Sequence, residues 1–426
     1  MIVEKNYSLL VGTEFKEMKL EECLIFLVNM NSIKIPIKSV IGQRLAYLIC
    51  SERCYSDLSE SNQADFKKIY VLDDFGIESV SDAFLDITSL NSQFSYKIIT
   101  NDECCNDICS QLNCKFLDAD YEDNSGYFQN KELMKKKFKD FNLPTYIYQR
   151  HIPSNYAQDK AVYISGVIGR LSLPLVCKPI DSTGSQGVAI IHSEADFEQW
   201  CEDHYAVDNY ELCEYVFGDL YHCDSIVVDG KIEYTRIGKN SFPCHQISEG
   251  KNIGTFLVPI DSDIYTRIQN LNKKLITAFN PRNGATHMEV FEKLNGELVL
   301  LEVADRPPGG EMRWMYMTAD NVDIEAAHFN LRIGNKFDSL YSIAYGVLNV
   351  AWACFPCPEG RISKLNIPSI RSESNINWRV NVGDETIASA NLDTPKAGVI
   401  RLVNSDYTAI EEDYEVIKSF LFVDVN

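Results

Sequence analysis

The stretch from Gly284 to Gly310, GATHMEVFEKLNGELVLLEVADRPPGG, predicts two β-strands joined by a tight turn. Asn295-Gly296 lies between two runs of alternating apolar residues. This pattern is a strong signal for a two-residue type I′ turn, because both central residues of that turn have φ > 0. A two-residue turn would fix the register along the whole hairpin, since register in hairpins follows from loop length.

The predicted register brings two carboxylates face to face. It places Val290 opposite Leu301 and, one position further from the turn, Glu289 opposite Glu302. The two glutamates fall on a non-hydrogen-bonded pair, where Cα atoms lie roughly 4.5 Å apart. Like charges repel there, whereas a cation between them removes the repulsion, and carboxylates are typical ligands of Mg²⁺. The hairpin alone fits either a metal site or a surface hairpin with two solvated glutamates.

The charge balance limits the partners of this chain. It has 426 residues, with 40 Lys+Arg and 61 Asp+Glu, and a formal net charge of −21. That charge argues against binding to nucleic acid or to an anionic membrane. The first residues, MIVEKNYSLLVGTEF, lack the pattern of a secretion signal, and no apolar run approaches the length of a membrane span. We therefore expect a cytoplasmic enzyme whose anionic ligands bind at a local basic site.

The 14 cysteines are scattered through the chain. In a long chain without a secretion signal we expect reduced thiols. Cys354 and Cys357 form a single C-x-x-C, and no second pair stands at the spacing that a zinc site needs. Structural thiols are the favoured interpretation.

Short apolar runs alternate with helix-permissive segments from Tyr7 to about Asp120, beginning with a strand at Ser8–Val11. This alternation predicts βα units on a parallel sheet. No G-x-G-x-x-G follows the first strand, so the sequence gives no support for dinucleotide binding. A polar connector from Asn124 to Gln129 ends this region, and residues 336–426 predict a smaller α+β cap.

A helix is expected after Asn130, which can cap it, and ends before Leu143-Pro144. Lys131 lies in its first turn, where the helix dipole attracts anions. The other lysines of this helix are interpreted as a solvated face: Lys135, Lys136, Lys137 and Lys139.

A second basic position follows in LPLVCKP, a short apolar strand that contains Lys178. The loop Ser182-Thr183-Gly184-Ser185-Gln186-Gly187 comes directly after it. A strand ammonium beside backbone N–H groups that glycines leave accessible suits phosphate binding. The order of residues excludes a Walker A loop and a kinase glycine loop. An edge-strand lysine beside an ordinary turn is the alternative.

Asp229-Gly230 predicts another two-residue hairpin. Its register places Val228 opposite Lys231 and Asp224 opposite Thr235.

These motifs occur in a recognisable order. NKELMKKKFKDFNLP, PLVCKPIDSTGSQGV, CEYVFGDLYHCD and the glutamate hairpin together cover roughly residues 130–310. The combination resembles the ATP-grasp superfamily, and the forms GATHMEVF and LLEVADRPPGG look most like its L-amino-acid ligase or dipeptide ligase branch. The resemblance implies a multidomain α/β and α+β chain. It would have a Rossmann-like N-terminal βα domain (1–123), an ATP-grasp domain (124–335) with a lid at about 150–216, and a C-terminal α+β subdomain (336–426).

The resemblance also implies a role for each motif residue. Lys131 and Lys178 would hold the phosphates of ATP, and Arg306 would lie near the transferred phosphoryl group, so Lys178 and Arg306 are the catalytic candidates. The remaining roles are loop closure over the phosphates by Ser182, Gly184, Ser185 and Gly187, adenine binding by Glu214 and the backbone of Val216, and Mg²⁺ or Mn²⁺ binding by Glu289 and Glu302.

The family reaction joins a small-molecule carboxylate to an amine through an acyl phosphate, with release of ADP and phosphate. An amino-acid substrate is expected from the resemblance. The C-terminal α+β cap could form the surface of a homodimer or a substrate surface. One alternative is an ATP-grasp ligase for a non-amino-acid or carrier-bound acyl group. The other alternative is a non-catalytic ATP-binding protein with a regulatory role.

Three positions depart from the family pattern. Ala304 stands where an asparagine ligand often follows the second glutamate, so one metal ligand is absent. Leu220 replaces a ribose-binding acid, and Cys213 replaces a hinge glutamate. Histidines near the motifs are interpreted as structural residues, with His287 the best candidate for a further role because it shares the face of Glu289; the set is His222, His245 and His287.

Overall fold

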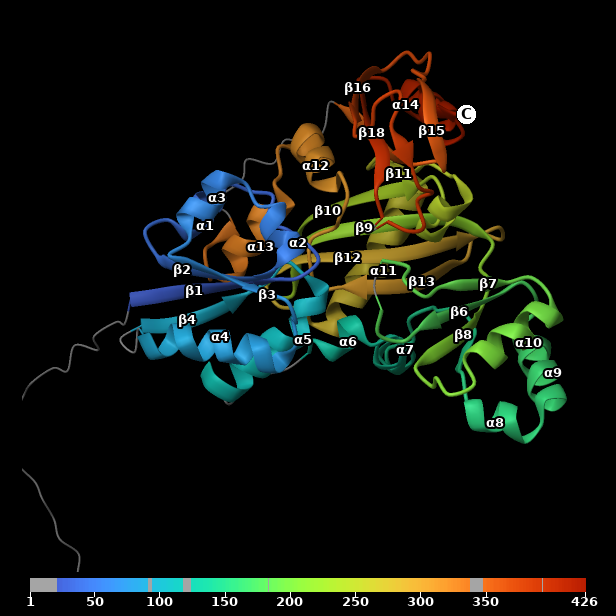
Figure 1. The fold of residues 1–426 in the computed structure, drawn as a ribbon, viewed down its shortest axis with the longest axis horizontal. Coiled ribbons are helices and arrows are strands. Elements are labelled where there is room, and N and C mark those ends of the chain that lie inside the picture. The colour runs from blue at the N-terminus through green and yellow to red at the C-terminus, as the bar shows by residue number, and fades with distance from the viewer. Residues whose placement is uncertain (1–20, 91–93, 118–123, 183, 338–347, 393) are drawn as a thin grey trace, which may run out of the picture.

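The structure is a computed structural model, and it describes residues 21–90, 94–117, 124–182, 184–337, 348–392 and 394–426. The strand expected at Ser8–Val11 and the loop residue Thr183 lie outside the described residues. Three regions are visible in Figure 1: an N-terminal sheet on the left, a long central sheet, and a small sheet with its helices at the lower right.

The N-terminal sheet is parallel, as the alternating pattern predicted. Its strands follow the order β3-β2-β1-β4, with bounds β1 (Glu21–Val28), β2 (Leu45–Ser51), β3 (Lys68–Leu72) and β4 (Phe94–Ile99). Alternate residues of β1 enter two different cores, because both faces of a parallel sheet are covered. Leu24 and Phe26 share a core with residues of α1 (Lys38–Ile41) and α2 (Glu52–Ser56), and α3 (Glu60–Asp65) follows α2 along the chain. Ile25 shares the other core with residues of α4 (Ile77–Leu90) and α5 (Glu103–Leu112).

The central sheet has eight strands in the order β13-β12-β9-β10-β11-β14-β18-β16. Every pair within it is antiparallel. The strands are β9 (Gly218–Val228), β10 (Lys231–Asn240), β11 (Ile253–Leu257), β12 (Gly284–Lys293), β13 (Leu298–Ala304), β14 (Asn349–Pro356), β16 (Glu373–Trp378) and β18 (Lys396–Asn404). The boundary expected between residues 335 and 336 therefore falls between strands of one sheet, and the three-part division stays a prediction.

Helices cover the two faces of the central sheet. The core on one face includes Met288 and Val290 of β12 together with residues of α7 (Lys131–Asp140), α11 (Asp263–Phe279) and α14 (Tyr407–Lys418). The core on the other face includes Ala285 together with residues of α12 (Met312–Asp320) and α13 (Ile324–Arg332). Because strand side chains alternate between faces, Glu289 lies on the face of Ala285.

A separate four-stranded antiparallel sheet, β5-β8-β6-β7, lies beside the glutamate hairpin (Figure 1). It consists of β5 (Tyr148–Arg150), β6 (Leu175–Pro179), β7 (Ala189–Ile191) and β8 (Tyr210–Glu214), with α8 (Pro153–Gln158), α9 (Lys160–Leu171) and α10 (Glu194–Asp203). Its apolar residues form their own core. We call it the lid sheet.

The glutamate hairpin keeps its predicted acid pair but not its predicted turn. Glu289 faces Glu302, whereas Val290 faces Leu300 and not Leu301. The loop has three residues, since the Lys293 N–H donates to the Glu297 carbonyl, and of Asn295 and Gly296 only the glycine has positive φ. Such a loop shifts the register by one residue. A bulge at Leu301 shifts it back, so two irregularities cancel before the acid pair.

The second hairpin has the predicted two-residue turn. Asp229 and Gly230 both have positive φ, and Val228 faces Lys231. The prediction that Asp224 faces Thr235 was wrong, because a bulge between Ile232 and Tyr234 places Arg236 opposite Asp224.

Three short strands near the C-terminus form the remaining sheet, β17-β15-β19, with bounds β15 (Gly360–Leu365), β17 (Glu385–Thr386) and β19 (Val423–Val425). All fourteen cysteines are among the described residues, and none forms a disulfide, as expected from the sequence. The described part of the chain contains no helix with the length and apolar character of a membrane span.

Candidate active site

A cavity of about 840 Å³ lies between the lid sheet and the central sheet, with the N-terminal sheet at one end. That volume is in the range of small-molecule sites. All but one of the predicted site residues line it: Lys131, Lys178, Ser182, Gly184, Ser185, Glu214, Val216, Glu289, Glu302 and Arg306. Gly187 is the exception. A Cβ at this residue would lie 2.8 Å from the Pro179 ring, so Gly187 lets the loop pack against the end of β6.

The charges around the acid pair favour the ionised form of Glu302. Burial raises the pKa of Glu302, but the positive charges of Lys131, Lys178 and His287 outweigh it, and the pKa lies below its usual value. Glu289 stands opposite on β12, with 16% of its side chain exposed. Two carboxylates on one sheet face, beside a cluster of cations, fit a divalent metal with phosphate ligands. The residues present therefore suit Mg²⁺, which Glu289 and Glu302 would hold.

The two predicted phosphate lysines, Lys131 and Lys178, line the same cavity as the acid pair, and both act electrostatically on Glu302. The Lys131 ammonium donates to the Ser182 carbonyl at 2.6 Å, which ties helix α7 to the small-residue loop. Lys178 is buried on β6, and its Nζ lies 4.8 Å from the centre of the Tyr146 ring. Burial lowers the pKa of Lys178, but the acidic groups around it, with Cys213 and Glu211 first, raise it overall. Lys178 is thus a buried cation near the acid pair.

The interpretation of Lys135 as a solvated lysine was wrong. Its side chain is fully buried and forms an ion pair with Glu211 of β8. The Tyr146 hydroxyl donates to the other oxygen of Glu211 at 3.0 Å, and Lys178 Nζ lies 3.9 Å from that oxygen. The sequence held a signal for this position. Lys135 lies one residue after Met134 and three before Phe138, on the apolar stripe of the helix.

The adenine candidates lie where the lid sheet meets the hairpin. Glu214 accepts from the Ile147 N–H at 2.9 Å, and Lys293 Nζ lies 3.5 Å from the same carboxylate oxygen. The cavity here is mostly apolar, as a planar aromatic base requires. Its walls are formed by Val176, Val188, Ile190, Leu220, Phe291 and Leu301. Leu220 and Cys213, which depart from the family pattern, both line the cavity.

Arg306 is held by a residue that the sequence did not single out. Its Nε donates to Glu103 at 3.0 Å, and Glu103 begins helix α5 behind the N-terminal sheet. Burial raises the pKa of Glu103, with Arg306 opposing this effect. A residue from another part of the fold therefore orients Arg306. The contact spans 203 positions in sequence, and no local pattern announces it.

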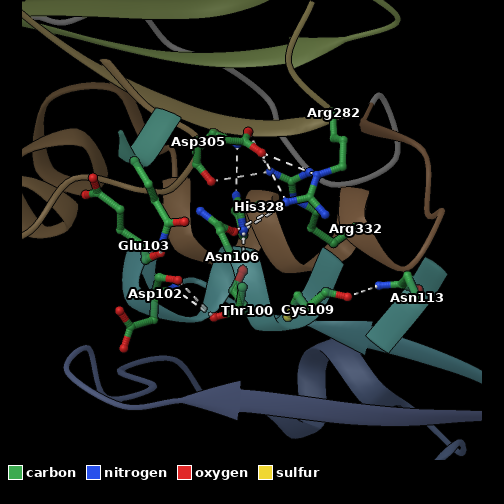
Figure 2. Close-up of polar contacts among 12 residues, drawn as sticks. Thr100, Asp102, Glu103, Asn106, Cys109, Asn113, Arg282, Asp305, His328 and Arg332 are labelled. Carbon is green, nitrogen blue, oxygen red and sulfur yellow. Dashed lines mark hydrogen bonds and ion pairs between the residues drawn. The ribbon is translucent and has the colours of Figure 1, made fainter. Parts of the chain in front are cut away.

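Figure 2 shows the polar contacts that join the segment after β13 to its neighbours. Asp305, next to Arg306, forms ion pairs with Arg332 at 2.7 Å and with Arg282 at 3.2 Å. The His328 Nε2 lies 2.8 Å from the Thr100 carbonyl, while its Nδ1 accepts from the backbone of β12. Burial lowers the pKa of His328 to about 3, so the ring is neutral. The end of β13 is thereby anchored to the N-terminal sheet.

His287 faces Ala304 in the hairpin register. Its Nδ1 lies 2.5 Å from Asp224, and its Nε2 lies 3.6 Å from Glu289. Asp224 also contacts His222 at 2.7 Å and accepts from the Tyr316 hydroxyl. Burial lowers the pKa of His287, but Asp224 and Glu289 outweigh it and raise the pKa to about 10. His222 and His287 are thus both fixed by one buried carboxylate, while His245 lines the cavity.

The chain is similar to known proteins in sequence and in fold. No protein-family model matches the chain. A curated L-arginine-specific L-amino acid ligase of Bacillus subtilis is 24% identical over 247 residues, which are 56% of this chain and 57% of that protein. The chain therefore spans little more than half the length of this relative.

Solved structures match over nearly the whole chain. An L-amino acid ligase from Bacillus licheniformis has a TM-score of 0.70 at 13% identity, covering 95% of this chain and 98% of its own. The N5-carboxyaminoimidazole synthetase of Staphylococcus aureus, in complex with ADP, has a TM-score of 0.63 at 14% identity, covering 92% and 96%. The chain has the fold of these ligases. The ATP-grasp fold expected from the sequence motifs is confirmed, with its mixture of parallel and antiparallel sheets.

Proposed function

We propose that this ATP-grasp chain is a cytoplasmic ligase that uses ATP to join the carboxylate of an amino acid to an amine. The observation that carries the proposal is one cavity lined by the acid pair Glu289 and Glu302 together with three cationic side chains, Lys178, Lys131 and Arg306. Phosphoryl transfer requires positioning and neutralisation of charge more than a protein nucleophile. This set of side chains supplies both.

The proposed reaction has two steps. A carboxylate oxygen of the first substrate attacks the γ-phosphorus of ATP, the bond from that phosphorus to the bridging oxygen breaks, and ADP leaves. The amine nitrogen of the second substrate then attacks the acyl carbon. The C–N bond forms, the C–O bond to phosphate breaks, phosphate leaves, and the amine proton is released. The products are an amide, ADP and phosphate.

Each residue has a role in this scheme. Lys131 and Lys178 bind the phosphates, and the loop from Ser182 to Gly187 covers them and excludes water from the acyl phosphate. Glu214 and Val216 orient the adenine. Mg²⁺, when bound by Glu289 and Glu302, neutralises charge on the phosphate oxygens; Mn²⁺ has the same ligand preference. Arg306, oriented by Glu103, stabilises the charge that develops on the transferred phosphoryl group.

An amino-acid substrate is favoured by the names of two similar proteins, both amino acid ligases. The second candidate is a ligase with an acyl substrate other than an amino acid, because the chain also has the fold of a carboxyaminoimidazole synthetase. We further interpret the N-terminal sheet as a Rossmann-like domain that closes one end of the cavity. We also propose that residues from about 150 to 216 act as the lid and that residues 336–426 form a C-terminal subdomain. The proposed assembly is a homodimer.

The decisive experiment measures phosphate release from Mg·ATP with a pool of the twenty amino acids, alongside mass spectrometry of the products. We expect phosphate and a dipeptide in equal amounts. Lys178→Ala and Glu302→Gln should each abolish both, while Lys136→Ala, at an exposed lysine of helix α7, should change neither. Folded protein that binds ATP but releases no phosphate would favour a non-catalytic, regulatory role instead.

A further inference from the structure

The acid pair has a candidate for a third metal ligand on the same strand. His287 precedes Glu289 by two positions in β12, so both side chains leave the same face of the sheet. The Nε2 atom of His287 lies 3.6 Å from an oxygen of Glu289. Two ligand atoms of one metal ion lie about 3 Å apart in an octahedral site and about 3.4 Å apart in a tetrahedral one. A small movement of either side chain would therefore let one ion contact both atoms.

The position across from His287 carries no ligand atom. His287 faces Ala304 in the hairpin, in the same way that Glu289 faces Glu302. The two pairs are separated by one residue on each strand, so all four side chains share one face of the sheet. Because alanine ends at Cβ, Ala304 neither supplies a ligand nor crowds the imidazole. The face thus offers three ligand groups, and the third is the histidine.

The Nε2 atom of His287 is available for a ligand. The side chain is only 10% exposed, and it lines the cavity. Among the described residues, the hydrogen bond of this ring is made by Nδ1, which donates to Asp224. The Glu289 oxygen at 3.6 Å from Nε2 is beyond hydrogen-bond range. A buried ring nitrogen in such a position needs a partner.

Asp224 holds the ring in the orientation that a metal ligand requires. Its carboxylate accepts from Nδ1 of His287 at 2.5 Å and is itself fixed by His222 and Tyr316. A carboxylate on the second ring nitrogen is the usual support of a metal-binding histidine, because it fixes the ring and raises the basicity of the ligand nitrogen. His222 does not compete for the metal, since its own Nε2 lies 3.0 Å from the Thr255 hydroxyl.

The charges around Nε2 favour a cation there. Asp224 and Glu289 stabilise positive charge on the ring, with Arg306 opposing them, and Glu302 also interacts electrostatically with His287. The same carboxylates favour a divalent ion at Nε2. An ion bound here takes the place of the Nε2 proton, which is released to solvent.

We infer that His287 is a third protein ligand, through Nε2, of the metal ion held by Glu289 and Glu302. The inference rests on the proposed metal site and completes its ligand set. Mg²⁺ prefers oxygen ligands, whereas an imidazole nitrogen is a common ligand of transition-metal ions. The site should therefore bind Mn²⁺ more tightly than Mg²⁺.

The first test identifies the ligand atom in the folded wild-type protein. With Mn²⁺ and ADP bound, electron spin echo envelope modulation detects nitrogen nuclei that are coordinated to the ion. We expect the modulation of a directly bound ¹⁴N, and its replacement by a ¹⁵N pattern in protein labelled only at histidine. The label distinguishes an imidazole from the adenine of ADP. Absence of the histidine signal while Mn²⁺ is bound would overturn the inference.

His287→Gln assigns the signal to one residue. This variant should lose the histidine modulation, whereas His192→Gln, at an exposed histidine directly after β7, should retain it. A signal that persists in His287→Gln would also overturn the inference. Thermal unfolding shows whether both variants remain folded, and the result with labelled wild-type protein does not depend on either of them.

Metal preference supplies a second readout. The affinity for Mn²⁺ in the presence of ADP is measured from the electron paramagnetic resonance signal of the free ion, and the affinity for Mg²⁺ from its competition with Mn²⁺. We expect His287→Gln to weaken Mn²⁺ binding by at least about tenfold. Mg²⁺ binding should weaken less, because glutamine offers an oxygen in place of the nitrogen. Equal losses for the two ions would contradict the inference.

The ligase function and the role of His287 fail in different ways. Histidine modulation without phosphate release in the amino-acid assay would keep His287 as a ligand and reject the ligase function. Phosphate release with a dipeptide product, but no histidine modulation from bound Mn²⁺, would keep the ligase function and reject the ligand.

Discussion

Lys135 and Glu211 form an ion pair behind the phosphate end of the cavity, with only 0% and 4% of their side chains exposed. Glu211 serves two buried lysines, because Lys178 lies 3.9 Å from its second oxygen. A carboxylate shared in this way fixes the position of Lys178 and keeps it protonated in a buried environment.

Glu211→Gln should therefore affect both stability and the pH dependence of activity. Two buried ammonium groups would lose their carboxylate, which costs roughly 3–5 kcal/mol when a buried pair is broken. Glu211 is among the groups that raise the pKa of Lys178. Without it that pKa falls, so activity should be lost at lower pH than in the wild type as the pH is raised. Urea denaturation and a pH profile of kcat/KM for ATP measure the two effects.

The control for this variant is Glu132→Gln, an exposed carboxylate of helix α7 that pairs with Arg150. It should shift the unfolding free energy by less than about 1 kcal/mol. An unshifted pH profile in Glu211→Gln would show that Glu211 does not act through Lys178.

Asp224→Asn should destabilise the fold strongly. Asp224 is fully buried and accepts from His222, His287 and Tyr316. An asparagine amide would present a donor where these groups need an acceptor. The unfolding free energy should fall by roughly 3 kcal/mol, the loss expected for a buried charged acceptor. Asp219→Asn, an exposed carboxylate on the same strand, is the matched control, and equal effects of the two changes would contradict the prediction.

Glu325 makes the junction with the N-terminal sheet sensitive to pH. Burial raises the pKa of Glu325 from 4.5 to about 7, although the Lys34 N–H donates to its carboxylate. A raised pKa stabilises the fold fully below about pH 4.5, and this contribution is lost as the pH rises through 7. Glu325→Gln keeps the acceptor oxygen and should become more stable relative to the wild type by roughly 3 kcal/mol between pH 5 and pH 8.

Thermal or urea unfolding at both pH values measures that difference for Glu325→Gln. Glu373→Gln, on the exposed side of β16, supplies the control. A difference between wild type and Glu325→Gln that does not change with pH would mean that Glu325 is already ionised at pH 5.

Glu103→Ala should slow the reaction while leaving ATP binding nearly unchanged. Glu103 orients Arg306 at 3.0 Å, and small displacements of a catalytic group cost up to about 100-fold in rate. We expect kcat to fall by about 10- to 100-fold, with a much smaller change in KM for ATP. Steady-state kinetics against Glu60→Ala, an exposed residue of α3, tests this, and a change confined to KM would exclude the proposed role.

The sequence predicted the elements of the site better than the contacts between them. Lys178, Glu289 and Glu302 were found because short motifs carry their chemistry. The burial of Lys135 was missed because it lies in a run of lysines, which is typical of a solvated helix face. Its partner Glu211 lies 76 positions away in sequence. The contact between His328 and Thr100 spans 228 positions, and neither residue has a local pattern that signals it.

The pairing of the two glutamates was predicted correctly, although the turn on which the prediction was based was wrong. The sequence favoured a two-residue loop, whereas Leu294 joins Asn295 and Gly296 in a loop of three. The prediction survived because the bulge at Leu301 restores the pairing of Glu289 with Glu302. Neither irregularity could be read from the sequence, because the first four residues of β13, LVLL, are all apolar and so show no alternation that would fix the register.

That bulge has a consequence for recognising such sites in other chains. The segment between Leu301 and the hairpin tip can gain or lose a residue, with the change absorbed at the bulge, while Glu289 and Glu302 keep their pairing. Surface hairpins are where chain length varies most between relatives. A search that demands one fixed interval between the two glutamates would therefore discard homologues whose metal-binding geometry is intact.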